Sequence, residues 1–122
     1  MNSNWRSFLE STGAVFKDGS DEILNFGDTS GELQAASDQT VLVPLTHLGL
    51  IEATGDDAKA FLHSQFTNDV LALAVGAAQW NGWCTPKGRL LVTFVLARDA
   101  GGYFLLLPSA FAEAIAKRLR MF

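Results

Sequence analysis

Several features that mark common protein classes are missing from this sequence of 122 residues. It has a single cysteine, Cys84, so it can form no internal disulfide and no metal site built from several cysteines. The apolar run Leu71–Ala78 is too short to cross a bilayer, which requires about 20 apolar residues. The start of the chain carries no charged and apolar signal segment. We therefore expect a reducing, cytoplasmic setting and no membrane partner.

Recognisable catalytic motifs are also missing. The sequence contains neither G-x-x-x-x-G-K-[ST] nor G-x-G-x-x-G, two glycine-rich loops that hold phosphates. Its histidines, His47 and His63, lie far apart, and no evident base adjoins Cys84 to activate the thiol. No histidines or acids are paired at the spacing of metal ligands. We therefore assign no catalytic residue and no metal ligand.

What remains is the composition of a globular domain with an uneven distribution of charge. Hydrophobic residues make up 48% of the chain and charged residues 18%, which excludes disorder and predicts one domain with its own core. Residues 1–57 carry ten acids and two bases, whereas residues 58–122 carry three acids and seven bases. The basic half suits an anionic small molecule or a nucleic-acid backbone, unless the two halves neutralise one another.

Residues 1–40 are predicted to form an N-terminal segment made of a helix, a hairpin and a surface loop. Apolar residues recur at helical spacing within residues 3–12, so we expect a short helix there. The apolar runs 14–16 and 23–26 flank the turn-rich stretch KDGSDE and predict a hairpin. Residues 27–40 are polar and rich in small side chains, which favours a loop.

Two further helices are expected in the rest of the chain. An amphipathic pattern predicts a helix over residues 57–69, with Asp56 and Asp57 capping its N-terminus. Ser109 can cap a final helix that is still running at the last residue.

A hairpin and several strands complete the expected elements. Thr85-Pro86-Lys87-Gly88 has the proline and glycine preferences of a type I turn. We place the hairpin there because the rival turn Asn81-Gly82 would leave its first strand too short. The expected strands are residues 41–43, 48–53, 77–84, 89–98 and 102–107.

These elements predict an α+β fold in which helices flank an antiparallel sheet. From residue 41 the order is strand, helix, strand, strand, strand, helix, and a ferredoxin-like unit would add another strand next. We therefore expect residues 41–122 to form a subdomain that is truncated at its C-terminus, as a fragment of a longer protein. The alternative is a natural short chain that ends in a helix.

Two polar clusters could carry a function. Ser64–Val70 is rich in residues that compete for backbone hydrogen bonds, so it predicts either a helix C-cap or a rigid hydrogen-bonding corner. Lys87 and Arg89 flank a glycine. They are either solvated charges at a hairpin tip or a pair of cations that holds an anion. Trp80 and Trp83 should face opposite sides of their strand, so at most one can line a pocket beside those cations.

The two clusters in this order resemble the glycine-cleavage T-protein (GcvT, aminomethyltransferase) superfamily, and most of all its YgfZ-type folate-binding branch. In that branch a G-x-D-A-x-x-F-L-x-x-Q-x-T-N-D-V helix is followed by a D/P-K-G-[RK] hairpin. The resemblance covers residues 41–122, and residues 1–40 match only loosely. The matching residues are Gly55, Asp57, Ala58, Phe61, Leu62, Gln65, Thr67, Asn68, Asp69, Val70, Pro86, Lys87, Gly88 and Arg89.

The resemblance implies a tetrahydrofolate-binding protein longer than this chain, with folate in a central channel between subdomains. The YgfZ-type branch supports iron–sulfur cluster assembly or repair and tRNA thiomodification without acting as an aminomethyltransferase. Two departures bear on this reading. The stretch Leu91–Phe94 lacks the acid that supports folate chemistry in T-protein enzymes, and the K-G-C-x-x-G-Q-E signature of the YgfZ branch is absent. We therefore favour a non-enzymatic role, and expect the signature downstream in a longer protein.

The chemistry of folate suits the residues that the resemblance covers. Folate has a flat pterin with hydrogen-bonding edges and an anionic glutamate tail, so its pocket needs an aromatic wall, amide partners and cations. Lys87 or Arg89 could attract the tail, and the polar side chains could bond the pterin. The predicted folate-binding residues are Gln65, Asn68, Trp83, Lys87, Gly88, Arg89 and Thr93.

Two other functions stay open at this point. One is a folate-dependent aminomethyltransferase, and the other is an accessory domain that binds RNA through the basic half. RNA is not favoured as a partner, because Lys117, Arg118 and Arg120 are the only group of three bases close in sequence and a helix C-terminus explains them. The expected partners are folate, iron–sulfur proteins and, through exposed apolar surface, other copies of the chain.

Overall fold

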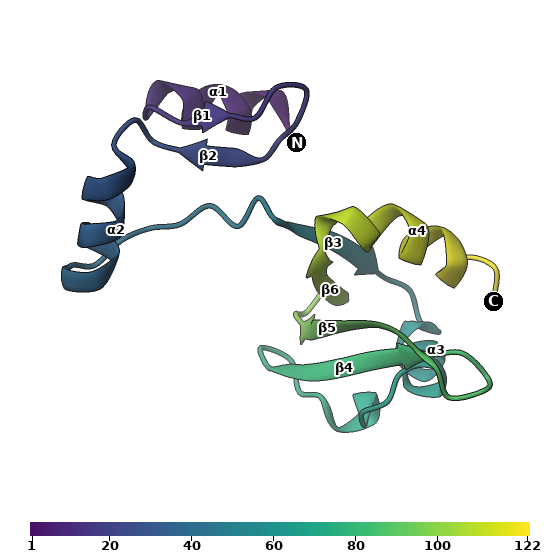
Figure 1. Cartoon of the computed structure of the whole chain (residues 1–122). Helices are drawn as coiled ribbons and strands as arrows, with labels where there is room; N and C mark the ends of the chain where they lie inside the picture. The colour runs from purple at the N-terminus through teal and green to yellow at the C-terminus, as the bar shows by residue number, and fades with distance from the viewer. The chain divides into compact units, whose positions relative to one another are not determined.

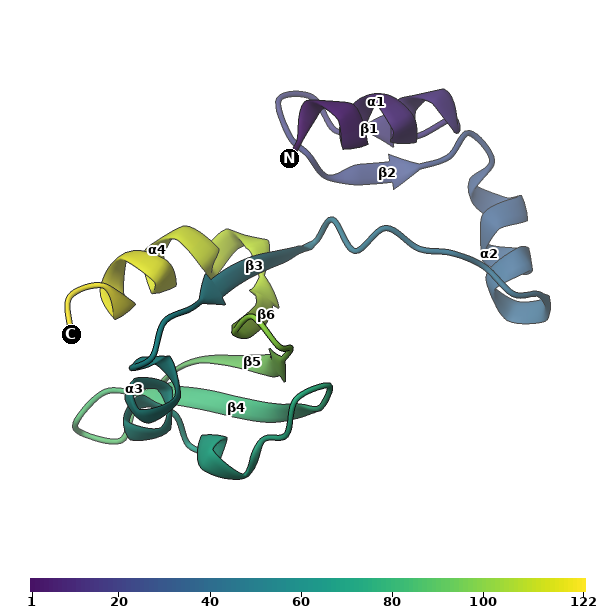
Figure 2. The ribbon, with the colours of Figure 1, turned by 180° about the vertical axis from the view of Figure 1, so that it is seen from behind.

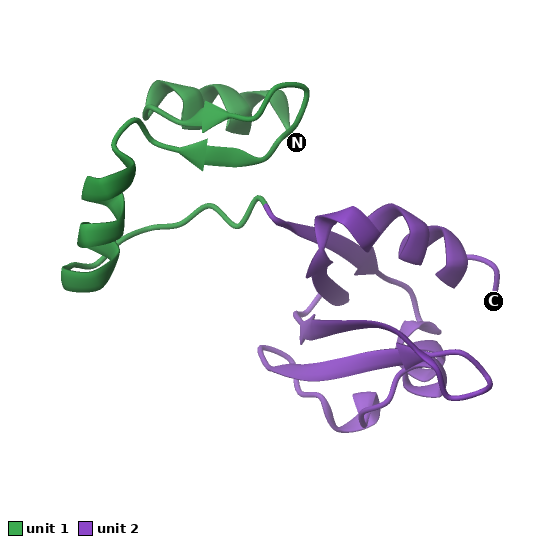
Figure 3. Ribbon diagram, viewed as in Figure 1, with its two compact units in different colours: residues 1–46 green, residues 47–122 purple.

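A computed structural model describes the whole chain, residues 1–122. The chain divides into two compact units, Met1–Thr46 and His47–Phe122, which we call unit 1 and unit 2 (Figure 3). The structure contains helices and antiparallel sheets, as the α+β prediction requires. Each unit is described by itself.

Unit 1 begins with the predicted helix and hairpin. Helix α1 spans Ser3–Ser11, and the side chain of Asn2 caps it by accepting hydrogen bonds from two backbone N–H groups of its first turn. Strands β1 (Val15–Phe16) and β2 (Ile23–Asn25) pair antiparallel, which confirms the hairpin.

The predicted loop over residues 27–40 is wrong, because residues Thr29–Asp38 form helix α2. The carboxylate of Asp28 accepts a hydrogen bond from the N–H of Gly31 at 3.1 Å and so caps the helix. Glu32 adds a negative charge near the positive end of the helix dipole. This local capping outweighs the polar composition on which the loop prediction rested.

A second correction concerns residues 41–43, which form no strand. They belong to a stretch without helix or strand that follows α2 and carries exposed apolar side chains, among them Leu42, which is 99% exposed. Without a neighbouring strand, the backbone of β-prone residues has no hydrogen-bond partner and is not counted as sheet.

Unit 2 contains the predicted order of strand, helix, three strands and helix (Figure 1). Its antiparallel sheet has the order β3-β6-β5-β4, so the consecutive strands β4, β5 and β6 are neighbours and β3 adds to the far edge. The strands are β3 (Leu48–Ala53), β4 (Ala78–Cys84), β5 (Leu90–Arg98) and β6 (Tyr103–Pro108). These bounds confirm four of the five predicted strands.

Helix α3 spans Ala58–Gln65 and is shorter than predicted. Asp57 holds the N-cap position without a side-chain hydrogen bond, so the predicted aspartate cap is wrong. The helix stops because Phe66 becomes extended and forms a bridge with Trp83 of β4. A short 3-10 helix, η1 (Val70–Ala72), follows, and the Asp69 side chain caps it.

Helix α4 spans Ser109–Leu119, so it ends before the last residue rather than running to it. Ser109 is its first residue, not its cap. Pro108 holds the cap position without a side-chain hydrogen bond. The N–H of Ser109 donates instead to the carbonyl of His47 at 2.9 Å, which ties the start of the helix to the residue before β3.

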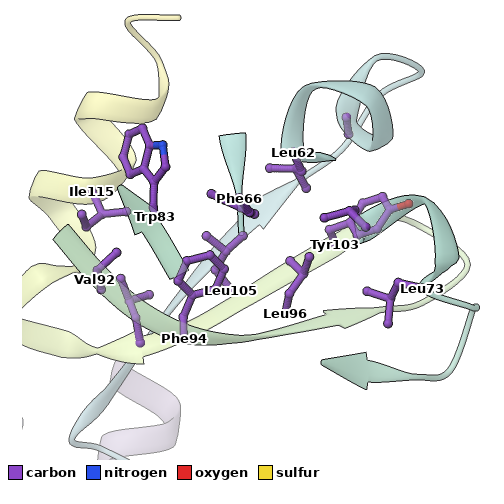
Figure 4. Packing of buried hydrophobic residues seen from close by; sticks show 13 residues of the cluster. Leu62, Phe66, Leu73, Trp83, Val92, Phe94, Leu96, Tyr103, Leu105 and Ile115 are labelled. Carbon is purple, nitrogen blue, oxygen red and sulfur yellow. The ribbon is translucent and has the colours of Figure 1, made fainter. Parts of the chain in front are cut away.

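The core of unit 2 lies between one face of the sheet and the helices α3 and α4. Leu62 of α3 and Ile115 of α4 join inward side chains such as Phe94, Leu96 and Leu105 in one buried cluster (Figure 4). Seen from behind, α3 lies in front of β4 (Figure 2). No helix of unit 2 covers the other face of the sheet, and the most exposed of its large apolar side chains is Trp80, at 72%.

Candidate functional site

The β4–β5 hairpin presents two of the predicted site's cations to solvent. The N–H of Gly88 donates to the carbonyl of Thr85 at 2.8 Å, which closes the turn that the sequence predicts. Gly88 has φ +78°, a conformation that favours glycine, and its Cα faces open space. Lys87 and Arg89 are exposed on either side of it and form no ion pair. An anion can therefore approach both side chains directly.

Trp83 is a core residue rather than a free aromatic wall. Its side chain is 3% exposed and packs edge-on against Phe66, with 6.4 Å between ring centroids. The indole Nε1–H donates to Oε1 of Gln65 at 3.3 Å. Trp80, three residues earlier, is exposed on the other face, so the predicted alternation is confirmed. Gln65 and Trp83 are thus in contact, and the indole N–H of Trp83 is already bonded within unit 2.

Asn68 belongs to a clasp between the end of α3 and the edge of β4. Its Nδ2 donates to the carbonyl of Trp80 at 3.0 Å, and its backbone N–H donates to Oδ1 of Asn81 at 3.0 Å. Thr67 adds two bonds to Gly82, one through its N–H and one through its hydroxyl oxygen. We call these hydrogen bonds the β4 clasp. It shows that the polar corner predicted from the sequence holds the edge strand.

Thr93 lies apart from the other predicted residues. It pairs with Gly82 in the sheet, and it is exposed on the face opposite Trp83, whose partner is Val92. The structure therefore brings together the hairpin cations and the Gln65–Trp83 pair at one end of unit 2. It places Thr93 elsewhere.

The structure adds a residue to this end that sequence spacing could not reveal. Arg118 of α4 places its guanidinium carbon 5.8 Å from the ring centroid of Trp83. Phe122 packs edge-on against the same indole, with centroids 6.2 Å apart. Because positions 83 and 118 are 35 apart in the sequence, only the packing of α4 on the sheet brings them together.

Other polar groups of the chain are not among the predicted site residues. Nδ1 of His63 lies 3.5 Å from Oδ1 of Asp69, and Cys84 is a free, partly buried thiol. In unit 1 a cavity of about 220 Å³ is lined by Arg6, Gly19, Ser20 and Asp21. There the Met1 amino group and then Arg6 hold the pKa of Asp21 below its ordinary value by hydrogen bonding.

No group of three His, Cys, Asp or Glu side chains is arranged to hold a metal ion. None of the helices has the length and apolar character needed to traverse a bilayer.

Comparison with known proteins adds a family and several relatives. The family described as GCVT N-terminal domain matches residues 11–121. The tRNA-modifying protein YgfZ of Vibrio vulnificus (strain CMCP6) is 35% identical over 92 residues, which are 75% of this chain and 28% of that protein. The aminomethyltransferase of Bacillus subtilis (strain 168) is 30% identical over 87 residues, which are 71% of this chain and 24% of that protein.

A solved structure shares the fold. The glycine cleavage system aminomethyltransferase T of Bartonella henselae aligns with a TM-score of 0.66 and 19% identity. The alignment covers 96% of this chain and 34% of that one. The chain therefore spans about a quarter to a third of the length of the proteins it matches.

Proposed function

This chain belongs to the GCVT N-terminal domain family, and from that membership we propose that it is part of a non-enzymatic tetrahydrofolate-binding protein. The longer protein would assist iron–sulfur cluster assembly or repair and tRNA thiomodification. The observation that supports this proposal most is the similarity to a relative named as a tRNA-modifying protein, at 35% identity over 92 residues. The missing acid after the hairpin, within Leu91–Phe94, supports a role without aminomethyl transfer.

The residues present suit one part of folate, its anionic tail. Lys87 and Arg89 are exposed and unpaired, so they can bind the glutamate carboxylates by charge-assisted hydrogen bonds. Trp83 and Asn68 are already engaged within unit 2, so they support the hairpin rather than contact the pterin. We propose that the pterin pocket is completed by parts of the longer protein.

A calorimetric titration of 5-formyltetrahydrofolate into this chain tests the assignment of the tail site. Saturable binding is expected, and Lys87→Ala or Arg89→Ala should each weaken it about two- to fivefold, as for an exposed ion pair worth up to about 1 kcal/mol. Lys59→Ala is the matched control, because it removes a cation from the first turn of α3. Equal weakening by Lys59→Ala would refute the hairpin assignment.

A second candidate is aminomethyl transfer to tetrahydrofolate. It is favoured by the similarity to the aminomethyltransferase of Bacillus subtilis, at 30% identity over 87 residues. An assay of aminomethyl transfer, with the longer protein and tetrahydrofolate as acceptor, separates the two candidates. Turnover would establish the enzyme. Folate binding without turnover, together with loss of cluster-dependent tRNA thiolation when the protein is removed, supports the non-enzymatic role.

A further inference from the structure

Most of the cations of unit 2 gather at one end, although they are far apart in the sequence. Unit 2 contains seven lysines and arginines. Two are in the β4–β5 hairpin and three are in or next to the last turn of α4. We call this set the cationic end: Lys87, Arg89, Lys117, Arg118 and Arg120.

Trp83 connects the two groups of cations. It lies two residues before the turn that carries Lys87, and the guanidinium of Arg118 stands over its ring at 5.8 Å. In both views of the ribbon the hairpin and the end of α4 lie on the same side of unit 2 (Figures 1 and 2). The packing of α4 therefore brings together cations that are 28 positions apart in the sequence, at 89 and 117.

The charge at this end is not neutralised within the chain. All five side chains are exposed, and none forms an ion pair. The carbonyl end of α4 offsets roughly half a charge, and Glu113 is the only acid on that helix. Several other acids of unit 2, such as Glu52 and Asp99, lie towards the opposite end of the sheet, where Ala53 pairs with Tyr103.

We propose that the cationic end binds the phosphate backbone of RNA. A folate tail needs only the hairpin cations, which leaves the three cations of α4 without a partner. Five unpaired cations on two elements suit a polyanion with regularly spaced charges better than a single small ligand. The choice of RNA rests on the proposed function, because a relative is named as a tRNA-modifying protein.

The interaction should be governed by counterion release. For single strands the logarithm of the affinity falls by about 0.7 per phosphate contacted for each unit of log salt. Five contacts would give a slope near −3.5, with a dissociation constant in the range of about 10⁻⁴ to 10⁻⁶ M at physiological salt. The slope of log affinity against log salt therefore measures how many cations contact phosphates.

The test is a fluorescence-anisotropy titration of a labelled single-stranded RNA with this chain, from about 50 to 200 mM salt. The double variant Lys117→Gln, Arg120→Gln removes two cations of α4 and leaves Arg118 in place over Trp83. We expect its salt slope to become shallower by about 1.4, with affinity at least fivefold weaker at the lowest salt. The matched control is Lys17→Gln, Lys59→Gln, which has the same net charge and should leave the slope unchanged.

The outcomes separate this proposal from the folate proposal. No binding by the parent chain, or the same loss in both double variants, would overturn an RNA site at the cationic end. The folate titration is repeated on the double variant Lys117→Gln, Arg120→Gln. This variant should bind folate as tightly as the parent chain, because Lys87 and Arg89 are intact. RNA binding by this chain, with no folate binding by this chain or by the longer protein, would refute the folate proposal alone. Folate binding without RNA binding would refute the RNA proposal alone.

Discussion

Asn81 is the one buried polar residue of unit 2, with 4% of its surface exposed. Its Oδ1 accepts the backbone N–H of Asn68, and its Nδ2 donates to Oε1 of Gln79 at 2.9 Å. Both polar ends of the buried amide are therefore satisfied. The segment after α3 is held along the edge of β4 by this side chain, which explains why a polar residue is buried there.

Asn81→Ala should destabilise the chain by about 1–3 kcal/mol, because it leaves the N–H of Asn68 without its partner in a partly buried place. Urea unfolding followed by tryptophan fluorescence measures the loss. Asn4→Ala is the control, because that side chain is exposed and makes no hydrogen bond. If the two variants were equally stable, the β4 clasp would not contribute to stability.

At Gly49, strand β3 lies close against helix α4. A Cβ built on it would lie 2.7 Å from Cβ of Ala112 and 3.3 Å from the backbone of Ser109. Gly49→Ala should therefore cost about 1–3 kcal/mol, since the helix must move away from the strand. Thermal unfolding checks this against Gly101→Ala, whose nearest neighbour would be at an ordinary 3.4 Å. Equal melting temperatures for the two variants would contradict the close packing.

At the scale of elements, local capping decides where α2 forms. The helix has no fully buried residue, so the cap and the helix-forming alanines contribute more than burial does. The last turn of α3 shows the opposite case. There the backbone of Phe66 and Thr67 leaves the helix to pair with β4, and tertiary hydrogen bonds replace helical ones.

Asp28→Ala should weaken α2 by about 0.5–2 kcal/mol, because the N–H of Gly31 loses its acceptor. Amide hydrogen exchange of residues 29–38 reports the effect locally, and we expect faster exchange throughout the helix. Asp18→Ala is the charge-matched control, since Asp18 is exposed and forms no ion pair. Unchanged exchange in the Asp28 variant would show that the cap is not needed.

At the scale of the whole molecule, stability is concentrated in unit 2. All 13 residues of the buried cluster belong to it, whereas Leu9 is the one buried hydrophobic residue of unit 1. A folded state needs enough buried apolar surface to offset the loss of chain entropy, so the two units should differ sharply in independent stability.

Limited proteolysis should therefore cut within residues 40–46, where exposed side chains such as Leu42 and Val43 follow α2 without helix or strand. The fragment 47–122 should remain folded, with a cooperative thermal transition by circular dichroism. A peptide of residues 1–46 serves as the comparison and should show none. A fragment 47–122 that unfolds on cleavage would contradict the independence of its core.

Whether an element could be predicted from the sequence depends on whether local or long-range interactions form it. Strands β4 and β5 and their turn were predictable, because alternation and the Thr85–Gly88 turn preferences are local. The helix at Thr29–Asp38 was missed because polar composition outweighed the cap at Asp28 in the prediction. The strand at residues 41–43 was overpredicted because β-propensity does not supply a pairing partner.

For the candidate site, the sequence by itself determined the α+β class, the order of elements in unit 2 and the cations of the hairpin, since these depend on local pattern and turn chemistry. Only the tertiary structure decided that Trp83 is buried, that Asn68 is part of the β4 clasp, and that Thr93 faces away. It alone brought Arg118 of α4 over Trp83. The physical reason is that burial and contact between distant residues depend on how helices pack on a sheet, which neither spacing nor composition encodes locally.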